Sequence, residues 1–166
     1  MRKYLILIFV GVILFATGLC RSDHLFTNYY PKKEILMQQI DPKIVSENFA
    51  RWNEALLSKD PKRVADLYTK DATFLPTLSP DFKFGQEETE GYFEHFLKKS
   101  PAGKVIEEKV QTLSTESYLH SGMYNFELGP KDARHAVEAR FTFLWVQDDN
   151  GQWKIAHHHS SLKPQG

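Results

Sequence analysis

The sequence predicts one α+β domain in which a cone-shaped, curved antiparallel (mixed) sheet wraps around three N-terminal helices. The chain has 166 residues, enough for one domain and a short extension. Residues 42–99 carry apolar side chains at helical spacing, whereas the chain from residue 104 onward is rich in β-branched and aromatic residues. Helices followed by a run of long strands are typical of an α+β fold. Because three helices would not cover a flat sheet of that length, we expect the sheet to curl and leave a conical hollow suited to a small ligand.

The first helix is predicted to begin at Asp41 and Pro42, because an N-cap aspartate followed by proline is a common helix start. The apolar face of this helix recurs at spacings of four, three and four residues, at Val45, Phe49, Trp52 and Leu56.

Two shorter helices are predicted to follow. Asp60 and Pro61 repeat the start signal. Val64, Leu67 and Tyr68 then supply one face of the second helix. Thr89 is predicted to cap the third helix, which reads "EGYFEHFLKK". The buried side of the third helix is predicted to consist of Tyr92, Phe93, Phe96 and Leu97.

The strands are predicted from four segments: "KVIEEKVQTL", "ESYLHSGMYNFEL", "ARHAVEARFTFLWVQ" and "GQWKIAHHHSS". Turn signals separate them. The pieces "LGPKDA" and "DDNG" are predicted to be hairpin connections, and the second contains the Asn-Gly pair favoured in tight turns.

The N-terminus has the pattern of a secretory signal peptide. Arg2 and Lys3 precede an apolar run over residues 4–16, and small residues follow. The run is short for a membrane span, which needs roughly 20 apolar residues. Residues 1–20 are therefore predicted to be a signal peptide, with a short N-terminal anchor as the alternative, and we expect the protein to be periplasmic or secreted.

The rest of the chain is predicted to divide into a linker over residues 21–41 and a folded domain over residues 42–164. The only cysteine, Cys20, lies in or beside the predicted signal peptide, so the domain is expected to have no disulfide. A lipid-modified cysteine normally follows a small residue, whereas Leu19 is bulky.

Composition argues against several classes of function. Lysine plus arginine and aspartate plus glutamate both number 21, so the formal net charge is zero and no nucleic-acid partner is expected. No membrane partner is expected once the N-terminal segment is cleaved. The sequence has no serine elbow, phosphate loop, zinc-protease motif or dinucleotide fingerprint, and we predict no cofactor.

Three consecutive histidines lie near the C-terminus, in "WKIAHHHSS". On a regular strand side chains alternate between faces, so His157 and His159 share the face of Trp153 and Ile155. That face is bulky and apolar, which predicts that His157 and His159 point into the cone and His158 points outward. An imidazole there would contact a ligand or move a proton, because it titrates near neutral pH. The alternative is that one histidine only fills the cavity wall.

A metal site is not predicted. Two histidines at this spacing suit zinc, but zinc takes three or four protein ligands. Further ligands would have to come from Glu138, His135, His95 or Asp71, and none has a spacing that singles it out.

Four other residues are candidate ligand contacts. Arg140 lies on the face opposite to Phe141 and Phe143; if it points inward, its guanidinium would hold a carboxylate or phosphate. The alternation of side chains along this strand leaves the direction of the Arg140 side chain open, and the inward direction is preferred. Trp52, Tyr68 and Tyr124 are candidates for the pocket lining.

The segments "RWNEALLSKDPKRVADLYTKDATFLPT", "GYFEHFL", "SGMYNF", "ARFTFLWV" and "WKIAHHHSSLKP" occur in an order that resembles a known family. The resemblance is to bacterial members of the nuclear transport factor 2-like superfamily, within it to the calcium/calmodulin-dependent protein kinase II association-domain or SnoaL-like proteins. It covers about residues 43–164. It implies a cone-shaped barrel that dimerises or forms larger rings through its sheet, and implies no activity.

The sequence differs from the family pattern at Ser160, and it resembles some enzymes of the superfamily at Asp71. The kinase association domain carries a pocket-lining arginine near the end of its last strand, where this chain has Ser160, so that ligand chemistry is not carried over. Asp71 resembles the acid after the second helix that some superfamily enzymes use for proton transfer; the alternative is that it caps a turn.

Two main functions follow. The first is an exported, oligomeric domain that binds a small molecule, a small organic anion, in its conical pocket without catalysis. The alternative is an enzyme that transfers a proton beside a carbonyl, with Asp71 or His157 as base and Tyr68, Tyr124 or Arg140 as donor. A third possibility, binding of a partner protein, is left open by the sequence.

Overall fold

The computed structural model describes residues 39–165, and the predictions for the signal peptide and most of the linker lie outside this range. Three α-helices and one short 3-10 helix are present in it: α1 (Pro42–Leu57), α2 (Pro61–Ala65), α3 (Gly85–Phe96) and η1 (Leu97–Lys99). The strands are β1 (Tyr68–Leu75), β2 (Lys83–Phe84), β3 (Ala102–Ser114), β4 (Ser117–Leu128), β5 (His135–Gln147) and β6 (Trp153–Leu162).

The first two helices begin where the sequence predicts. Asp41 caps α1 and accepts a hydrogen bond from the backbone N–H of Lys43. Asp60 caps α2 in the same way through the N–H of Arg63.

Two local predictions are wrong. The second helix ends at Ala65, so Tyr68 is the first residue of β1 rather than part of a helical face. The third helix begins at Gly85 instead of Thr89. Gly85 has φ 71°, a left-handed conformation that turns the chain from β2 into α3 and favours glycine. Thr89 lies inside the helix, where its buried hydroxyl donates to the carbonyl of Gly85.

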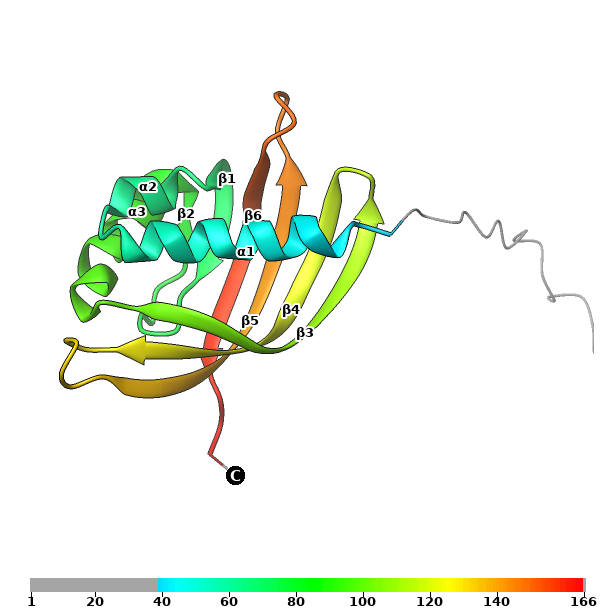
Figure 1. Cartoon of the computed structure of the whole chain (residues 1–166). Helices are drawn as coiled ribbons and strands as arrows, with labels where there is room; N and C mark the ends of the chain where they lie inside the picture. Colours follow the sequence, from blue (N-terminus) through cyan, green and yellow to red (C-terminus); the bar gives the residue numbers. More distant parts are fainter. Residues whose placement is uncertain (1–38, 166) are drawn as a thin grey trace, which may run out of the picture. The chain divides into compact units, whose positions relative to one another are not determined.

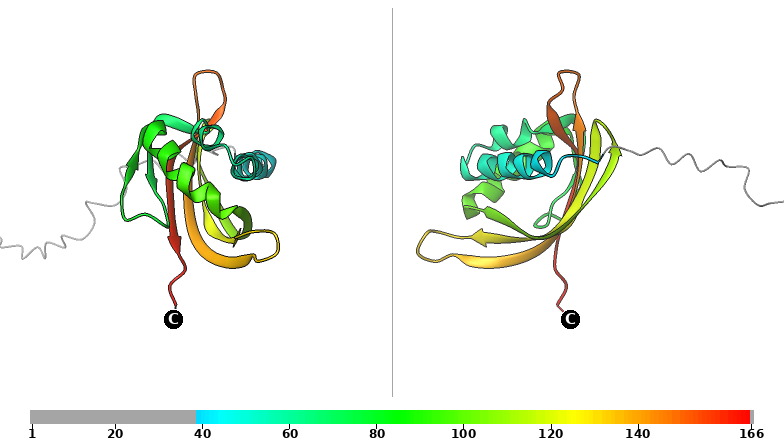
Figure 2. Two further views of the ribbon diagram at one scale, coloured as in Figure 1. Left: turned by 90° about the vertical axis from the view of Figure 1, so that its left-hand side faces the viewer. Right: turned by 45° about the vertical axis from the view of Figure 1, so that its right-hand side comes forward.

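The six strands form one sheet in the order β2-β1-β6-β5-β4-β3. All neighbouring pairs are antiparallel except β1 and β6, which are parallel, so the sheet is mixed. Figure 1 shows the long strands bending as they pass α1, and Figure 2 shows the three helices on the inner side of the curved sheet. The predicted fold class, a curved sheet wrapped around three helices, is confirmed.

Strand β6 contains one extra residue opposite β5. Trp145 pairs with Ile155, but the next residue of β5, Leu144, pairs with His157, so Ala156 has no partner of its own. Such a β-bulge reverses which face the following side chains occupy. Ile155 is fully buried before the bulge, and His158 and Ser160 are buried after it.

The core lies between the inner face of the sheet and the helices. Its largest fully buried side chains are aromatic and include Trp52 of α1, Tyr68 of β1 and Trp145 of β5. None of the helices within residues 39–165 has the length and apolarity needed to cross a membrane.

Candidate functional site

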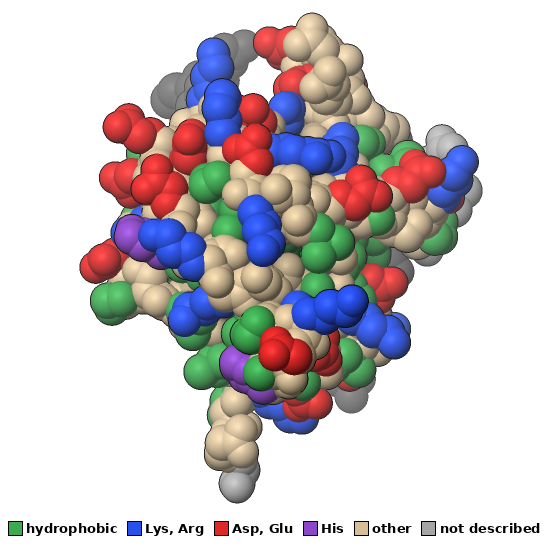
Figure 3. All heavy atoms as spheres, turned by 60° about the vertical axis from the view of Figure 1, so that its left-hand side comes forward, with side chains coloured by type: hydrophobic (Ala, Val, Ile, Leu, Met, Phe, Trp, Pro, Cys, Tyr) green, Lys and Arg blue, Asp and Glu red, His purple; other side chains and the backbone are tan. Residues whose placement is uncertain are grey.

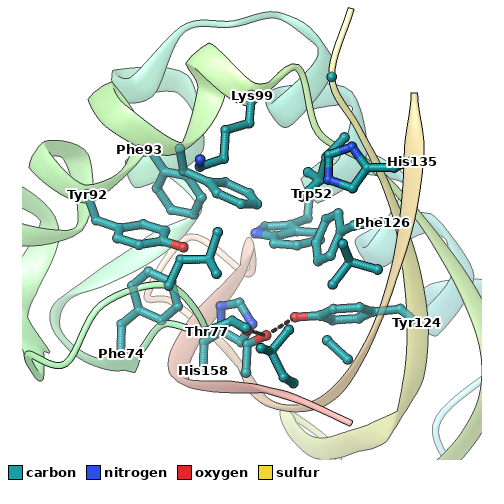
Figure 4. Close-up of a pocket in the computed structure, with 18 residues that line it drawn as sticks. Trp52, Phe74, Thr77, Tyr92, Phe93, Lys99, Tyr124, Phe126, His135 and His158 are labelled. Carbon is teal, nitrogen blue, oxygen red and sulfur yellow. Dashed lines mark hydrogen bonds between the residues drawn. The ribbon is translucent and has the colours of Figure 1, made fainter. Parts of the chain in front are cut away.

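The conical hollow predicted from the sequence is present. A cavity of about 430 Å³ lies between the inner face of the sheet and helices α1 and α3, a size typical of small-molecule sites. Figure 4 shows aromatic rings from both sides converging on it. Its lining comprises Trp52, Phe74, Thr77, Leu78, Tyr92, Phe93, Phe96, Lys99, Tyr124, Phe126, Leu128, Gly129, His135, Val137, Ala139, His158, Ser160 and Leu162.

The cavity wall is apolar and lacks negative charge. No aspartate or glutamate is found among the lining residues drawn from positions 39–165. Lys99 is the one lysine or arginine in that lining, and its ammonium group makes no hydrogen bond or ion pair with another residue in this part of the chain. Figure 4 shows Lys99 and His158 on opposite sides of the cavity. A negatively charged ligand would therefore be attracted by Lys99 and would not be repelled by a carboxylate of the lining.

His158 lies deep in this wall and is held between two aromatic rings. Its imidazole stacks on Phe74 of β1 at a centroid separation of 4.7 Å and on Phe143 of β5 at 4.1 Å. Its Nδ1 lies 2.9 Å from the hydroxyl of Tyr68, and that hydroxyl lies 3.3 Å from the indole nitrogen of Trp52.

These contacts determine the tautomer of His158. The indole of Trp52 can only donate, so the Tyr68 oxygen accepts from it and the Tyr68 hydroxyl donates to Nδ1 of His158. Burial holds the pKa of His158 well below its usual value of 6.5, and the neighbouring His157 and His159 lower it further, so the ring is neutral at pH 7. A neutral ring that accepts at Nδ1 carries its proton on Nε2.

The Nε2 atom of His158 is buried and has no hydrogen-bond partner within residues 39–165. A buried donor without a partner costs about 1–3 kcal/mol, and nearly all such groups in folded proteins are paired. His158 is also a lining residue of the cavity. Because Nε2 has less than 1 Å² of accessible surface, a ligand acceptor would reach it only after neighbouring side chains of the wall shift.

A row of hydroxyl groups lies beside His158. The Ser160 hydroxyl contacts both the Thr77 hydroxyl and the Tyr124 hydroxyl, and Figure 4 shows these contacts at the cavity floor. Burial raises the pKa of Tyr124, which keeps its hydroxyl protonated and able to donate. The floor therefore places hydroxyl groups beside the buried imidazole of His158 in an otherwise apolar wall.

Among the residues predicted to bind a ligand, Trp52 and Tyr124 line the cavity. Tyr68 is fully buried but lies behind the wall, where it holds His158 by the hydrogen bond described above. A direct ligand contact by Trp52 or Tyr124 stays a prediction.

The predicted inward direction of His157 and His159 is wrong. His157 bonds the Thr73 hydroxyl at 2.7 Å on the outer face, and His159 is exposed there. Burial lowers the pKa of His157, and the nearby His159 lowers it further. The cause is the bulge at Ala156, which exchanges the two sides of the strand after Ile155.

Arg140 also points outward, contrary to the preferred prediction. Its side chain is exposed, and its Nε donates to the Ser161 hydroxyl at 3.1 Å. The opposite face of β5 carries Phe141, Phe143 and Trp145, which are buried in the core. Those three rings occupy the inner side of β5, so Arg140 is left on the outer side.

Asp71 does not lie in the cavity. It is an exposed residue in the middle of β1 and is absent from the lining, so it is not positioned as a base there. Within residues 39–165 no group of three or more His, Cys, Asp or Glu side chains is arranged to hold a metal ion.

Three residues that line the cavity, His158, Thr77 and Lys99, were not predicted to do so from the sequence. For His158 a signal was present. If Ser160 occupies a pocket-lining position, as the resemblance implies, alternation backward from Ser160 places His158 inward. Alternation forward from Trp153 places His158 outward, and the two results agree only if the strand contains a bulge between them. No comparable signal pointed to Thr77 or Lys99.

Comparisons with known proteins agree with this architecture. Residues 43–164 match the family described as the calcium/calmodulin dependent protein kinase II association domain. A protein from Xanthomonas campestris, named as such an association domain, is 38% identical with a TM-score of 0.73; the match covers 77% of this chain and 91% of that chain. Among curated proteins, none matches.

Two more distant structures share the fold. An NTF2-like protein with a cystatin-like fold from Novosphingobium aromaticivorans is 11% identical, with a TM-score of 0.63 over 76% of this chain and 84% of that chain. A Catenulispora acidiphila protein in complex with S-DNPA is 16% identical, with a TM-score of 0.63 over 71% of this chain and 90% of that chain.

Proposed function

Because this chain belongs to the calcium/calmodulin dependent protein kinase II association domain family, we propose that it is an exported, self-associating domain that binds a small organic anion in its conical cavity. The observation that carries the proposal is the composition of the cavity wall. The wall is aromatic, has no carboxylate within residues 39–165, and has Lys99 on one side and the neutral imidazole of His158 on the other.

The wall also indicates the chemistry of the ligand. An apolar or aromatic body would pack against rings such as Trp52, Tyr92 and Phe126. An oxygen acceptor would take the N–H of His158, and a negative charge would pair with Lys99. The Catenulispora acidiphila protein, which shares the fold, has a structure in complex with S-DNPA, in line with a ligand-binding use of this architecture.

Binding without catalysis is favoured over proton abstraction beside a carbonyl. Such an enzyme needs a base that faces the substrate. The two predicted bases, Asp71 and His157, are not lining residues, and the tautomer of His158 carries a proton on Nε2 rather than a lone pair. This arrangement suits a donor that holds an oxygen atom in place.

Self-association is proposed through the outer face of the sheet. All three α-helices lie on the other face (Figure 2). The outer face of β4 and β5 carries half-buried aliphatic residues, among them Leu119, which pairs with Leu144, and Met123, which lies four residues further along β4 and pairs with Arg140. Family membership supports assembly, because the family is described as an association domain.

Native mass spectrometry of protein purified from its own host tests these points together. We expect a dimer or larger assembly that retains a small acid, and an N-terminus that lacks the first residues of the chain. A protein that is monomeric and also fails to bind any small organic anion in calorimetry would contradict the proposal.

A further inference from the structure

Two histidines on the outer face of β6 have no part in the proposed ligand site. His157 and His159 both follow the bulge and lie two residues apart, so their side chains share the face of the sheet that points away from the cavity. Charged side chains elsewhere are less distinctive. Figure 3 shows basic and acidic side chains interspersed on the side of the molecule that carries α3.

The two imidazoles are close enough to bind one ion. Residues two apart on a strand are separated by about 6.6 Å along it, and a metal–nitrogen bond is about 2 Å long, so two rings on one face can meet at an ion between them. Burial lowers the pKa of His157, and the nearby His159 lowers it further. The ring of His157 is therefore largely neutral at pH 7, and one of its nitrogens has a free lone pair.

Thr73 of β1 fixes the ring of His157. The Thr73 hydroxyl oxygen lies 2.7 Å from Nδ1 of His157, and the two residues are register partners in the parallel pair of β1 and β6. When Nδ1–H donates to this hydroxyl, the lone pair is on Nε2, which is not one of the side-chain atoms buried without a partner in residues 39–165. Histidines that bind metals almost always hold their other ring nitrogen in a hydrogen bond of this kind.

The number of ligands indicates which ion fits. Within residues 39–165 no third His, Cys, Asp or Glu side chain completes a cluster with this pair. Zinc normally takes three or four protein ligands, which the pair does not supply. Cupric ion accepts a tetragonal set of nitrogen and oxygen ligands and binds more tightly than the other divalent first-row ions. Two imidazole nitrogens, with water in the remaining positions, satisfy that geometry.

The surroundings of the pair are compatible with a cation. The residues that pair with His157 and His159 on the two adjacent strands are all uncharged: Thr73, Leu75, Thr142 and Leu144. Arg140 is the nearest basic residue on β5 and pairs with Ser161, two residues beyond His159. Its Nε donates to the Ser161 hydroxyl at 3.1 Å, and because the side chain is exposed, water and salt screen its charge.

We propose that His157 and His159 form a surface site for a cupric ion, and that Thr73 orients His157 for it. The site lies on the opposite face of the sheet from the conical cavity, so it does not depend on the binding of a small molecule there. His157 pairs with Leu144, so the ion binds at the border of the proposed contact surface. Binding is therefore measured on the protein in its own oligomeric state.

Electron paramagnetic resonance and calorimetry with copper sulfate, on the full chain in a buffer that does not bind copper, test the site. We expect one tightly bound Cu²⁺ per chain with two imidazole nitrogens, and binding of Zn²⁺ at least about tenfold weaker. In His159→Ala the two-nitrogen signal should be lost and the affinity for Cu²⁺ should fall more than about tenfold, because even the loss of an outer partner costs about 10–100-fold. His95→Ala is the matched control, because His95 is an exposed histidine on α3, away from β6.

Two variants of Thr73 test its positioning role. Thr73→Val keeps the shape of the side chain and removes the hydroxyl, so the affinity for Cu²⁺ should fall about tenfold while the two-nitrogen signal persists. Thr73→Ser restores a hydroxyl at the same position and should restore the affinity. Equal affinities in the wild type and Thr73→Val would show that Thr73 does not orient His157.

Two results would overturn the copper site itself. If His159→Ala binds Cu²⁺ as tightly as the His95→Ala control does, the pair is not the site. If the wild type binds Cu²⁺ only weakly and at many positions, without a two-nitrogen signal, the ion is adventitious. Neither result bears on the cavity, which is tested separately by the binding of an organic anion. Far-ultraviolet circular dichroism of each variant shows that a loss of binding is not a loss of fold.

Discussion

The hydroxyl of Tyr68 donates to Nδ1 of His158 over 2.9 Å, and this contact decides what His158 can do in the cavity. Tyr68 is one strand away and never reaches the cavity lining, yet it places the imidazole proton on Nε2. The polar character of the cavity floor is therefore set by a residue behind the wall.

Replacing His158 should separate binding from stability. In His158→Phe the new ring keeps the stacking position between Phe74 and Phe143. The unpaired Nε2–H disappears, while Tyr68 loses its acceptor, so we expect the free energy of unfolding in urea to change by less than about 1 kcal/mol. Affinity for a small organic anion should fall about tenfold in calorimetry. An unchanged affinity would mean that His158 does not contact the ligand.

Stability should decline in mild acid because of buried histidines. The pKa of His158 in the folded protein lies well below 6.5, so the unfolded chain binds more protons and stability falls as the pH drops below that value. Burial also lowers the pKa of His120, against the raising effect of its hydrogen bond to Glu108. The free energy of unfolding should be highest above about pH 7 and lose about 1.4 kcal/mol per pH unit per histidine as the pH falls.

Urea titrations between about pH 5 and pH 8 measure this dependence. The slope below about pH 6.5 should be shallower in His158→Phe than in the wild type, because one of the buried imidazoles is gone. Equal slopes in the two proteins would show that His158 is not the group whose protonation opposes folding.

A charge on the outer face of the sheet should prevent self-association. Leu144→Asp places a carboxylate on the proposed contact surface beside Leu119, and desolvating it would cost several kcal/mol. Size exclusion with light scattering should report a monomer for this variant. The matched control is Leu57→Asp, because Leu57 is 55% exposed on α1, away from the sheet. A monomeric control would indicate that any added charge disrupts the assembly.

Two glycine-to-alanine changes should act in opposite directions. A Cβ at Gly122 would lie 2.0 Å from the carbonyl oxygen of Glu107 on the adjacent strand, so Gly122→Ala forces β3 and β4 apart and should lower the unfolding free energy by about 3 kcal/mol or more. A Cβ at Gly91, inside helix α3, meets no atom within 4 Å. Gly91→Ala should therefore raise the free energy of unfolding by about 0.5–1 kcal/mol. Thermal unfolding followed by circular dichroism compares the two; a tolerated Gly122→Ala would contradict the close approach.

The fold was predictable because its signals are local or repeat along the chain. The aspartate-proline pairs start α1 and α2 as expected, since capping depends only on neighbouring residues. The start of α3 was missed because Gly85 acts through a left-handed backbone angle that the sequence pattern does not state.

The cavity was predictable in outline and its floor was not. Trp52 and Tyr124 belong to regular elements, so spacing alone puts them inside. The inward position of His158 depends on one unpaired residue, Ala156, in a strand whose register is set by pairing with β5. Pairing of that kind depends on residues far apart in the chain. Because the three consecutive side chains are all histidines, their polarity does not indicate which of them is buried.

The extra residue at Ala156 also allows a test of the strand register by deletion. Without Ala156, Ile155 and His157 would be consecutive residues that keep their present partners, Trp145 and Leu144. Simple alternation would then return with His158 still on the inner side, so a single codon deletion should remove the irregularity of β6 and leave the chemistry of both sheet faces as it is.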